Sequence, residues 1–412
     1  MSAQGSSPQR VIILGGGYAG LSAAYALTQA PGWQQRFEVT IYQIGWRLGG
    51  KAASGRNPEF YGRNEARGPH LWMGGYHHAF ALLDGCYREL GRQPPAPLPG
   101  WHEVVRPLHE LYLGGRLGGG TGQMLPLPLR AGQPGGLHQP ASIWACLVRM
   151  LRWVVQSLCT LNNHTYLVDW VATWPEARRR RLYASIRRAA RYGVHEYRKR
   201  PPAGQDRLTC GFTAATAPLR ETSLPGNPAT VRVWVAPLLL FADYGLAALG
   251  AEGKTTPLHG IVELAATIAR GLVEDRMYLR REFHNLRDID FREWLHRNRA
   301  RPQLLDHPAL LGLYDLFLAY KNGDTRTPSL AASAALECIT RGLCDGRGSL
   351  LYQFQSGPGE VVFAPLYEVL KRRGVKFRFF HRVKDIAANA SGHGISQVTL
   401  GQQVLLHRPE DG

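Results

Sequence analysis

The chain has 412 residues, of which 44% are hydrophobic, so it is long enough for roughly two or three domains and a sizeable core. This composition excludes an intrinsically disordered protein, and the formal net charge of +18 favours anionic partners. No RNA-binding signature or helix-turn-helix pattern is present, so an anionic membrane surface is the expected partner and nucleic acid is not. The N-terminus lacks the apolar stretch of a secretory signal and the six cysteines form no CxxC pair, which predicts a cytoplasmic location.

The beginning of the chain predicts a strand, a glycine turn, a helix and a second strand. Val11–Leu14 is a short apolar run typical of a parallel strand covered on both faces, and Phe37–Gln43 is the second strand. Between them stands a GxGxxG fingerprint, made of Gly15, Gly16, Gly17, Tyr18, Ala19 and Gly20. The first glycine allows a sharp turn, the second lets the backbone approach a pyrophosphate, and the third lets helix and strand pack closely. We therefore predict a dinucleotide site here, with the phosphates at the helix N-terminus.

Two features follow the second strand. A strand at this position usually ends in an acidic residue that binds the ribose hydroxyls, but here the residue is Gln43, which can bind a diol without charge assistance. The alternative is that Gln43 is an ordinary surface residue at a strand end. Next comes a loop containing Arg47, Gly49, Gly50 and Lys51, which suits an approach to a phosphate but is also compatible with an ordinary basic turn.

The middle of the chain is predicted to be mostly helical. The Gly- and Pro-rich residues 92–140 suggest a long loop at a site entrance. Residues 178–200 carry ten arginines and lysines around an apolar stripe, which predicts a basic amphipathic helix on an anionic membrane or a solvated basic face. The apolar stretches 143–161 and 231–249 are interrupted by Arg149 and Arg152 and by Pro237 and Asp243, so neither is a convincing membrane span.

The fingerprint, the RLGGK loop and Gly68–Leu83 together resemble the FAD-dependent flavoproteins that include the amine oxidases and the carotenoid (phytoene and ζ-carotene) desaturases. The resemblance implies an α/β fold, in which a Rossmann-like FAD/NAD(P)-binding domain is interrupted by a largely helical substrate domain. Its expected parts are residues 1–100 and 355–412 for the FAD domain and 101–354 for the substrate domain. It also places Val383 beside the adenine, and turns His70, Leu71, Trp72 and Tyr76 toward the flavin ring or the substrate. The family's late Gly-Asp motif is not found, so we expect a family member that is C-terminally incomplete.

The activity implied by this resemblance is hydride transfer from an apolar, isoprenoid-like substrate to FAD. No set of residues stands out as catalytic acid, base or nucleophile, and no metal site is expected. Two alternatives remain open. The chain could be an NAD(P)-linked oxidoreductase without flavin, with NAD(P) otherwise serving as an electron partner, or it could be a non-catalytic remnant of the fold.

Overall fold

The computed structural model describes residues 7–66, 68, 70–92, 100–113, 123–127, 129–136, 141–161, 167–193, 228–251, 257–280 and 283–405. Contacts divide the chain into two compact units. Unit 1 consists of residues 1–108, 129–138 and 347–412, and unit 2 consists of residues 109–128 and 139–346. The boundaries lie near those expected at 100 and 354, but the sequence did not predict the second crossing at 129–138.

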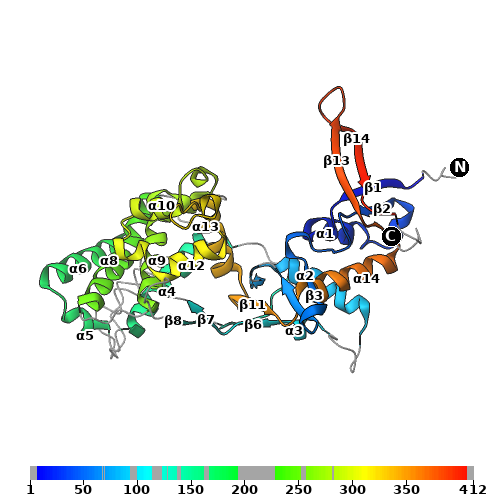
Figure 1. Ribbon diagram of the computed structural model, residues 1–412. Helices are drawn as coiled ribbons and strands as arrows, with labels where there is room; N and C mark the ends of the chain where they lie inside the picture. Colours follow the sequence, from blue (N-terminus) through cyan, green and yellow to red (C-terminus); the bar gives the residue numbers. More distant parts are fainter. Residues whose placement is uncertain are drawn as a thin grey trace. The chain divides into compact units, whose positions relative to one another are not determined.

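Unit 1 contains the N-terminal strand–helix–strand region (Figure 1). Its helices and strands, in chain order, are β1 (Gln9–Leu14), α1 (Tyr18–Leu27), β2 (Phe37–Tyr42), β3 (Ser54–Asn57), β4 (Arg63–Ala66), β5 (Leu71–Met73), α2 (His77–Leu90), α3 (Trp101–Val104), β6 (Val105–Pro107), β9 (Leu129–Arg130), β10 (Gly348–Ser349), β11 (Leu351–Phe354), α14 (Ala364–Arg373), β12 (Lys376–Arg378), β13 (His381–Ala388) and β14 (Ile395–Gln402). A π-helical segment, η8 (Gly359–Phe363), leads into α14.

The central sheet of unit 1 is parallel, in the order β1-β2-β12. Ile41 lies opposite Ile13 on one side and Phe377 on the other, so residues distant in sequence form one apolar layer. Helices α1 and α14 contact each other and cover this layer, in which Ile41 is fully buried. Ile12, which points to the other face, is 52% exposed. The prediction that β1 is covered on both faces is therefore wrong for the described residues.

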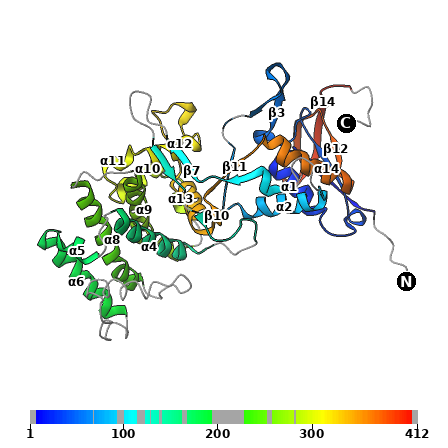
Figure 2. The same ribbon diagram turned by 90° about the horizontal axis from the view of Figure 1, so that it is seen from below.

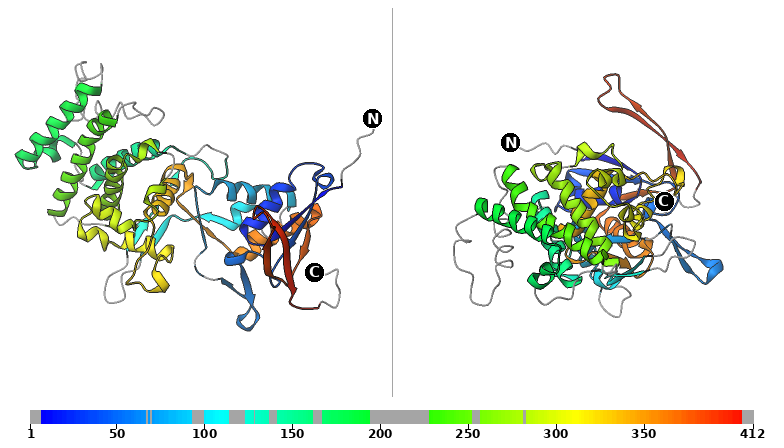
Figure 3. Two further views of the ribbon diagram at one scale, coloured as in Figure 1. Left: turned by 90° about the horizontal axis from the view of Figure 1, so that it is seen from above. Right: turned by 90° about the vertical axis from the view of Figure 1, so that its left-hand side faces the viewer.

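A second, antiparallel sheet has the order β5-β11-β6 and brings residues 71–73, 351–354 and 105–107 together. The β6 strand and helix α3 come from the Gly- and Pro-rich stretch that was expected to be a loop. Two hairpins extend from unit 1: β3–β4, seen in Figure 2, and β13–β14, seen in Figure 3.

Unit 2 is mainly helical, as predicted. Its helices and strands are β7 (Glu110–Leu113), β8 (Gln123–Pro126), α4 (Ile143–Leu161), α5 (Leu167–Ala172), α6 (Glu176–Gly193), α8 (Pro228–Ala251), α9 (Pro257–Glu274), α10 (Phe291–Arg297), α11 (Pro302–Leu305), α12 (Pro308–Leu316) and α13 (Ala332–Thr340). Helices α4, α8 and α9 contact one another, and α6 packs on α8 (Figure 1). Their apolar faces form a core that is separate from the core of unit 1.

Helix α8 runs without a break through Pro237 and Asp243, the two residues that interrupt its apolar stretch. By length and composition it is the one described helix that could cross a membrane. It lies against α4, α6 and α9, and its Asp243 forms an ion pair with Arg270 of α9. These contacts are those of a core helix in a bundle.

Candidate functional site

The candidate site begins where β1 turns into α1. Gly15 has a φ of +104°, a conformation that favours glycine, and its amide donates to the Tyr42 carbonyl oxygen at 2.8 Å. A Cβ added to Gly15 would meet nothing within 4 Å, whereas a Cβ added to Gly20 would overlap the Gly15 carbonyl oxygen. The backbone reasons for the first and third fingerprint glycines are thus confirmed, while binding by Gly15–Gly20 stays a prediction.

The N-terminus of α1 has no side-chain cap. Its N-cap residue is Gly17, and its first turn, which contains Tyr18, Ala19 and Gly20, has no acidic residue. The first amides of a helix have no intrahelical acceptor and carry a partial positive charge. This helix end, beside the open space at Gly15, therefore suits the phosphates of a dinucleotide.

The second glycine loop is bonded directly to the first. The Gly49 amide donates to the Gly16 carbonyl oxygen at 2.8 Å, and Gly17 and Gly49 form a parallel bridge. The Leu48 side chain covers Gly16, so that a Cβ on Gly16 would overlap it. Residues 15–20 and 47–51, which are separate in sequence, thus form one surface.

Gln43 lies between the two loops, and its side chain is only 6% exposed. Its Oε1 accepts from the Gly16 amide at 2.7 Å, and its Nε2 donates to the carbonyl oxygens of Ile44 at 2.6 Å and Arg47 at 2.9 Å. Gln43 therefore holds the loops together and is not a surface residue. The predicted contact with ribose stays a prediction, and it requires some of these bonds to be exchanged.

The charge around the two loops is positive. Neither 15–20 nor 43–51 contains an acidic residue. The Arg47 guanidinium stacks 4.5 Å from the ring centre of Trp46, which is itself 63% exposed. Among the described residues neither Arg47 nor Lys51 forms an ion pair with a carboxylate, although Arg47 interacts electrostatically with Glu65.

Val383 lies near the same end of the sheet. The Phe380 amide donates to the Gly45 carbonyl oxygen at 2.9 Å and the His381 amide to that of Gln43 at 3.0 Å, so β13 starts beside the end of β2. Val383 follows two residues later and is 36% exposed. This position is compatible with the predicted contact with adenine, which stays a prediction.

The residues predicted on the flavin or substrate side have different surroundings. Trp72 is 5% exposed and packs edge-on against Phe80 and Phe354, so it belongs to the core. Leu71 and His70 are half-buried, and the buried Nε2 of His70 has no hydrogen-bond partner. Tyr76 is 44% exposed. A ligand-facing role for these four residues stays a prediction. Trp72 could contact a ligand only through the small part of its ring that core packing leaves exposed.

Sequence reasoning missed Phe363, whose ring lies against Gly49 and at 4.7 Å from the Tyr18 ring. Burial raises the pKa of the Tyr18 hydroxyl to about 12. No local signal could have found Phe363, because it is distant in sequence from both loops. The Trp46–Arg47 stack was visible in principle as an adjacent aromatic and cationic pair.

Comparison with known proteins agrees with this geometry. Residues 13–86 match the family model described as an NAD(P)-binding Rossmann-like domain. A search of curated proteins found no match. The N-terminal part of the chain is thus a Rossmann-like dinucleotide-binding domain, and this supports an oxidoreductase that uses a dinucleotide.

Proposed function

We propose that the chain is an FAD-dependent oxidoreductase of the desaturase or dehydrogenase type, which removes hydride from an apolar substrate such as an isoprenoid. The observation that carries the proposal is the pair of glycine loops joined through Gly16 and Gly49, next to the uncapped start of α1. A single glycine turn suits any phosphate. Two joined loops with positive charge favour the longer pyrophosphate of a dinucleotide.

Each part of this surface has a proposed task. The amides of Tyr18, Ala19 and Gly20 would donate to the pyrophosphate, and Arg47 and Lys51 would balance its charge. Val383 would pack against the adenine. Gln43 would keep the loops in register, so that these groups need not reorganise when the cofactor binds.

FAD, when bound, would supply the hydride acceptor, and the chain would orient the substrate and exclude water. His70, Leu71, Trp72 and Tyr76 are the proposed wall on the ring or substrate side. The core packing of Trp72 against Phe80 supports a rigid wall. No residue of the chain is assigned as catalytic acid or base.

The test is flavin binding by purified protein and by one matched pair of variants. A Cβ at Gly17 would meet only the Gly50 Cα, at 3.9 Å, so Gly17→Ala should fold normally but block the approach of the pyrophosphate. We expect visible flavin absorbance after reconstitution, a loss of FAD affinity of about tenfold or more in Gly17→Ala, and no loss in Gly100→Ala. Gly100 is the control because a Cβ there meets nothing within 4 Å and it lies outside both loops. Protein that stays colourless after reconstitution would contradict the proposal.

A second candidate, an NADP(H)-linked oxidoreductase without flavin, is favoured by one specific observation. At the end of β2 there is no carboxylate for a 2′-hydroxyl, and the exposed cation Arg47 stands nearby, stacked on Trp46. An arginine near this position suits the 2′-phosphate of NADP. Thermal-shift titrations with FAD, NADPH and NADH separate the candidates. Stabilisation by NADPH alone, lost in Arg47→Ala, would favour the second.

We also propose that the protein is cytoplasmic and binds an anionic membrane through α6, where it would meet a lipid-dissolved substrate. Arg180, Arg181, Arg187 and Arg188 of α6 are exposed, whereas Leu182 and Ile186 are buried against the bundle. Residues 194–200 of the predicted basic segment lie outside the described residues. A basic face that stays solvated is the competing interpretation.

A further inference from the structure

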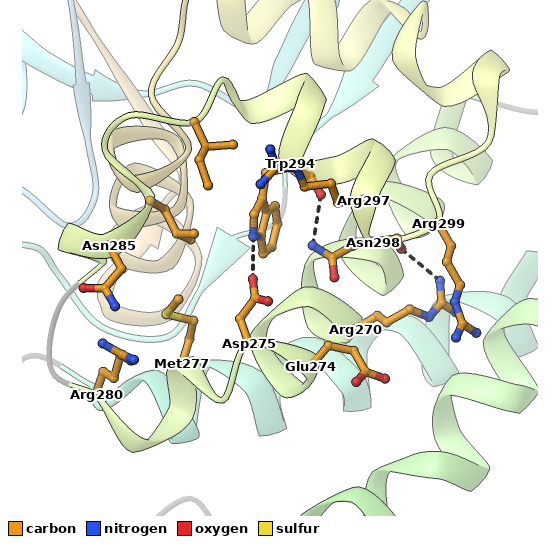
Figure 4. A pocket seen from close by; sticks show the side chains of 12 residues that line it. Arg270, Glu274, Asp275, Met277, Arg280, Asn285, Trp294, Arg297, Asn298 and Arg299 are labelled. Carbon is orange, nitrogen blue, oxygen red and sulfur yellow. Dashed lines mark hydrogen bonds between the residues drawn. The ribbon is translucent and has the colours of Figure 1, made fainter.

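Unit 2 contains a cavity of about 500 Å³ that no part of the proposed function uses (Figure 4). It lies where α9 and α10 end, and its lining comes entirely from residues 270–299. Cavities of this size hold small molecules rather than single ions. Its charged residues are Arg270, Arg280, Arg297, Arg299, Glu274 and Asp275.

Some of these charges are balanced within the fold. Arg270, which is 6% exposed, pairs with Asp243 and donates to the Asn298 carbonyl oxygen at 3.4 Å. Arg297 pairs with Glu293 one turn earlier on α10. Glu274 faces Arg232 at 3.3 Å. The charges of these groups are therefore balanced within the fold, although the Arg270 guanidinium also lines the cavity.

Two guanidinium groups and one carboxylate remain. Among the residues that the structure describes, Arg280 contacts the neutral Asn285 amide, whose oxygen accepts from Nη2 at 3.2 Å when the amide is oriented by its hydrogen bonds. Arg299 has no carboxylate partner among the described residues. Asp275 accepts from the Trp294 indole N–H at 2.7 Å, and no cation pairs with it in the described part of the chain. In Figure 4 Arg299 lies at the same end of the cavity as Arg270, and Arg280 lies at the other end.

The backbone at Arg299 is strained. Its φ is +68°, the left-handed region, and it stands where α10 ends and the Ala300 amide turns back to the Leu295 carbonyl oxygen at 3.0 Å. Glycine is the favoured residue at such a helix end. An arginine that keeps a left-handed backbone at the edge of a cavity suggests a binding role, because the fold alone would be better served by glycine.

We propose that this cavity binds a phosphate ester of a small hydroxylated molecule. The guanidinium groups of Arg299 and Arg270 lie at the end that would receive the phosphate, because a guanidinium matches phosphate oxygens in pairs. The free oxygen of Asp275 and the Asn298 amide would bond to hydroxyl groups. Arg280 would attract the anion from the opposite side. This proposal does not depend on the dinucleotide site in unit 1.

The test uses calorimetric titration of the full chain with glycerol 3-phosphate, and with glycerol as the uncharged probe. We expect binding of the phosphate ester and none of glycerol. Arg299→Gly should raise the melting temperature by roughly 2–4 °C, because glycine adopts a positive φ without strain. The same variant should lower the affinity for glycerol 3-phosphate by about tenfold. Gaining stability while losing affinity cannot be explained by damage to the fold.

The matched control is Arg276→Gly. Arg276 is also an exposed arginine with a positive φ, +53°, but it does not line the cavity. It should gain similar stability and keep wild-type affinity. Equal loss of affinity in both variants would mean that the ester binds through general surface charge, and this would overturn the proposal. Failure of the wild-type protein to bind the ester would overturn it as well. Phosphate that binds to the glycine loops of unit 1 would contribute equally to both variants and cancel in the comparison.

Discussion

Gln43 is the residue on which the shape of the dinucleotide loops depends most directly. Its amide accepts one hydrogen bond and donates two, and its side chain is buried. A carboxylate at this position could accept from Gly16 but could not donate to the carbonyl oxygens of Ile44 and Arg47. The glutamine that departs from the expected acidic residue is thus explained by the local hydrogen bonds.

This explanation predicts the effect of Gln43→Glu. The partly buried carbonyl groups of Ile44 and Arg47 would lose their donor, so the free energy of unfolding should fall by about 2 kcal/mol, measured by chemical denaturation. Dinucleotide affinity should not rise. If Gln43 instead acts mainly as a ribose ligand, glutamate would restore the usual charged acceptor and strengthen binding without loss of stability. Gln29→Glu, at an exposed position, is the control for the change of charge.

At the scale of single elements, α6 joins a buried stripe to an exposed basic face. Leu182 and Ile186 fix its position on the bundle, and this leaves Arg187 and Arg188 exposed and unpaired among the described residues. Each basic residue near an anionic membrane contributes about 1 kcal/mol. Part of the positive net charge of the chain is therefore concentrated on one exposed face of α6.

We expect the full chain to float with anionic vesicles and to remain unbound with zwitterionic vesicles. Replacing Arg187 and Arg188 with glutamine should lower partitioning by roughly 30-fold, which corresponds to about 2 kcal/mol. The same change at Arg287 and Arg326, which are 73% and 88% exposed elsewhere in unit 2, should have little effect. If both pairs lower binding equally, the net charge of +18 and not α6 is responsible.

At the scale of the whole molecule, each unit has its own hydrophobic core. The core of unit 1 is built from residues 21–105 and 352–377, and that of unit 2 from residues 143–336. Because the largest buried groups of one core take no part in the other, the units are expected to unfold in separate transitions.

Scanning calorimetry should therefore show two transitions. A dinucleotide should shift only the transition of unit 1 to a higher temperature. At a concentration of 100 times its dissociation constant, it should raise the free energy of unfolding of this unit by about 2.7 kcal/mol. The variant Gly20→Ala identifies the transition of unit 1, because a Cβ at this position overlaps the Gly15 carbonyl oxygen. The variant should lower the midpoint temperature of that transition and leave the other unchanged. A single transition that shifts as a whole would show that the units are thermodynamically coupled.

The sequence alone determined the features that depend on local backbone rules. The glycine turn after an apolar strand, the helix that follows it and the second strand were predictable, because Gly15 and Gly20 are required by a left-handed φ and by a close backbone approach. The helical character of unit 2 was predictable for the same reason, since amphipathic spacing is a local pattern.

Only the tertiary structure decided which side chains meet. The bonds of Gln43, the burial of Trp72 and the contact of Phe363 with Gly49 all depend on segments that are distant in sequence or on loops whose paths no propensity predicts. The short strand β6 was missed because pairing with β11, and not its own composition, makes it a strand. The cavity at Arg299 likewise exists because two helices end at the same place, and this is a property of packing that a one-dimensional pattern does not contain.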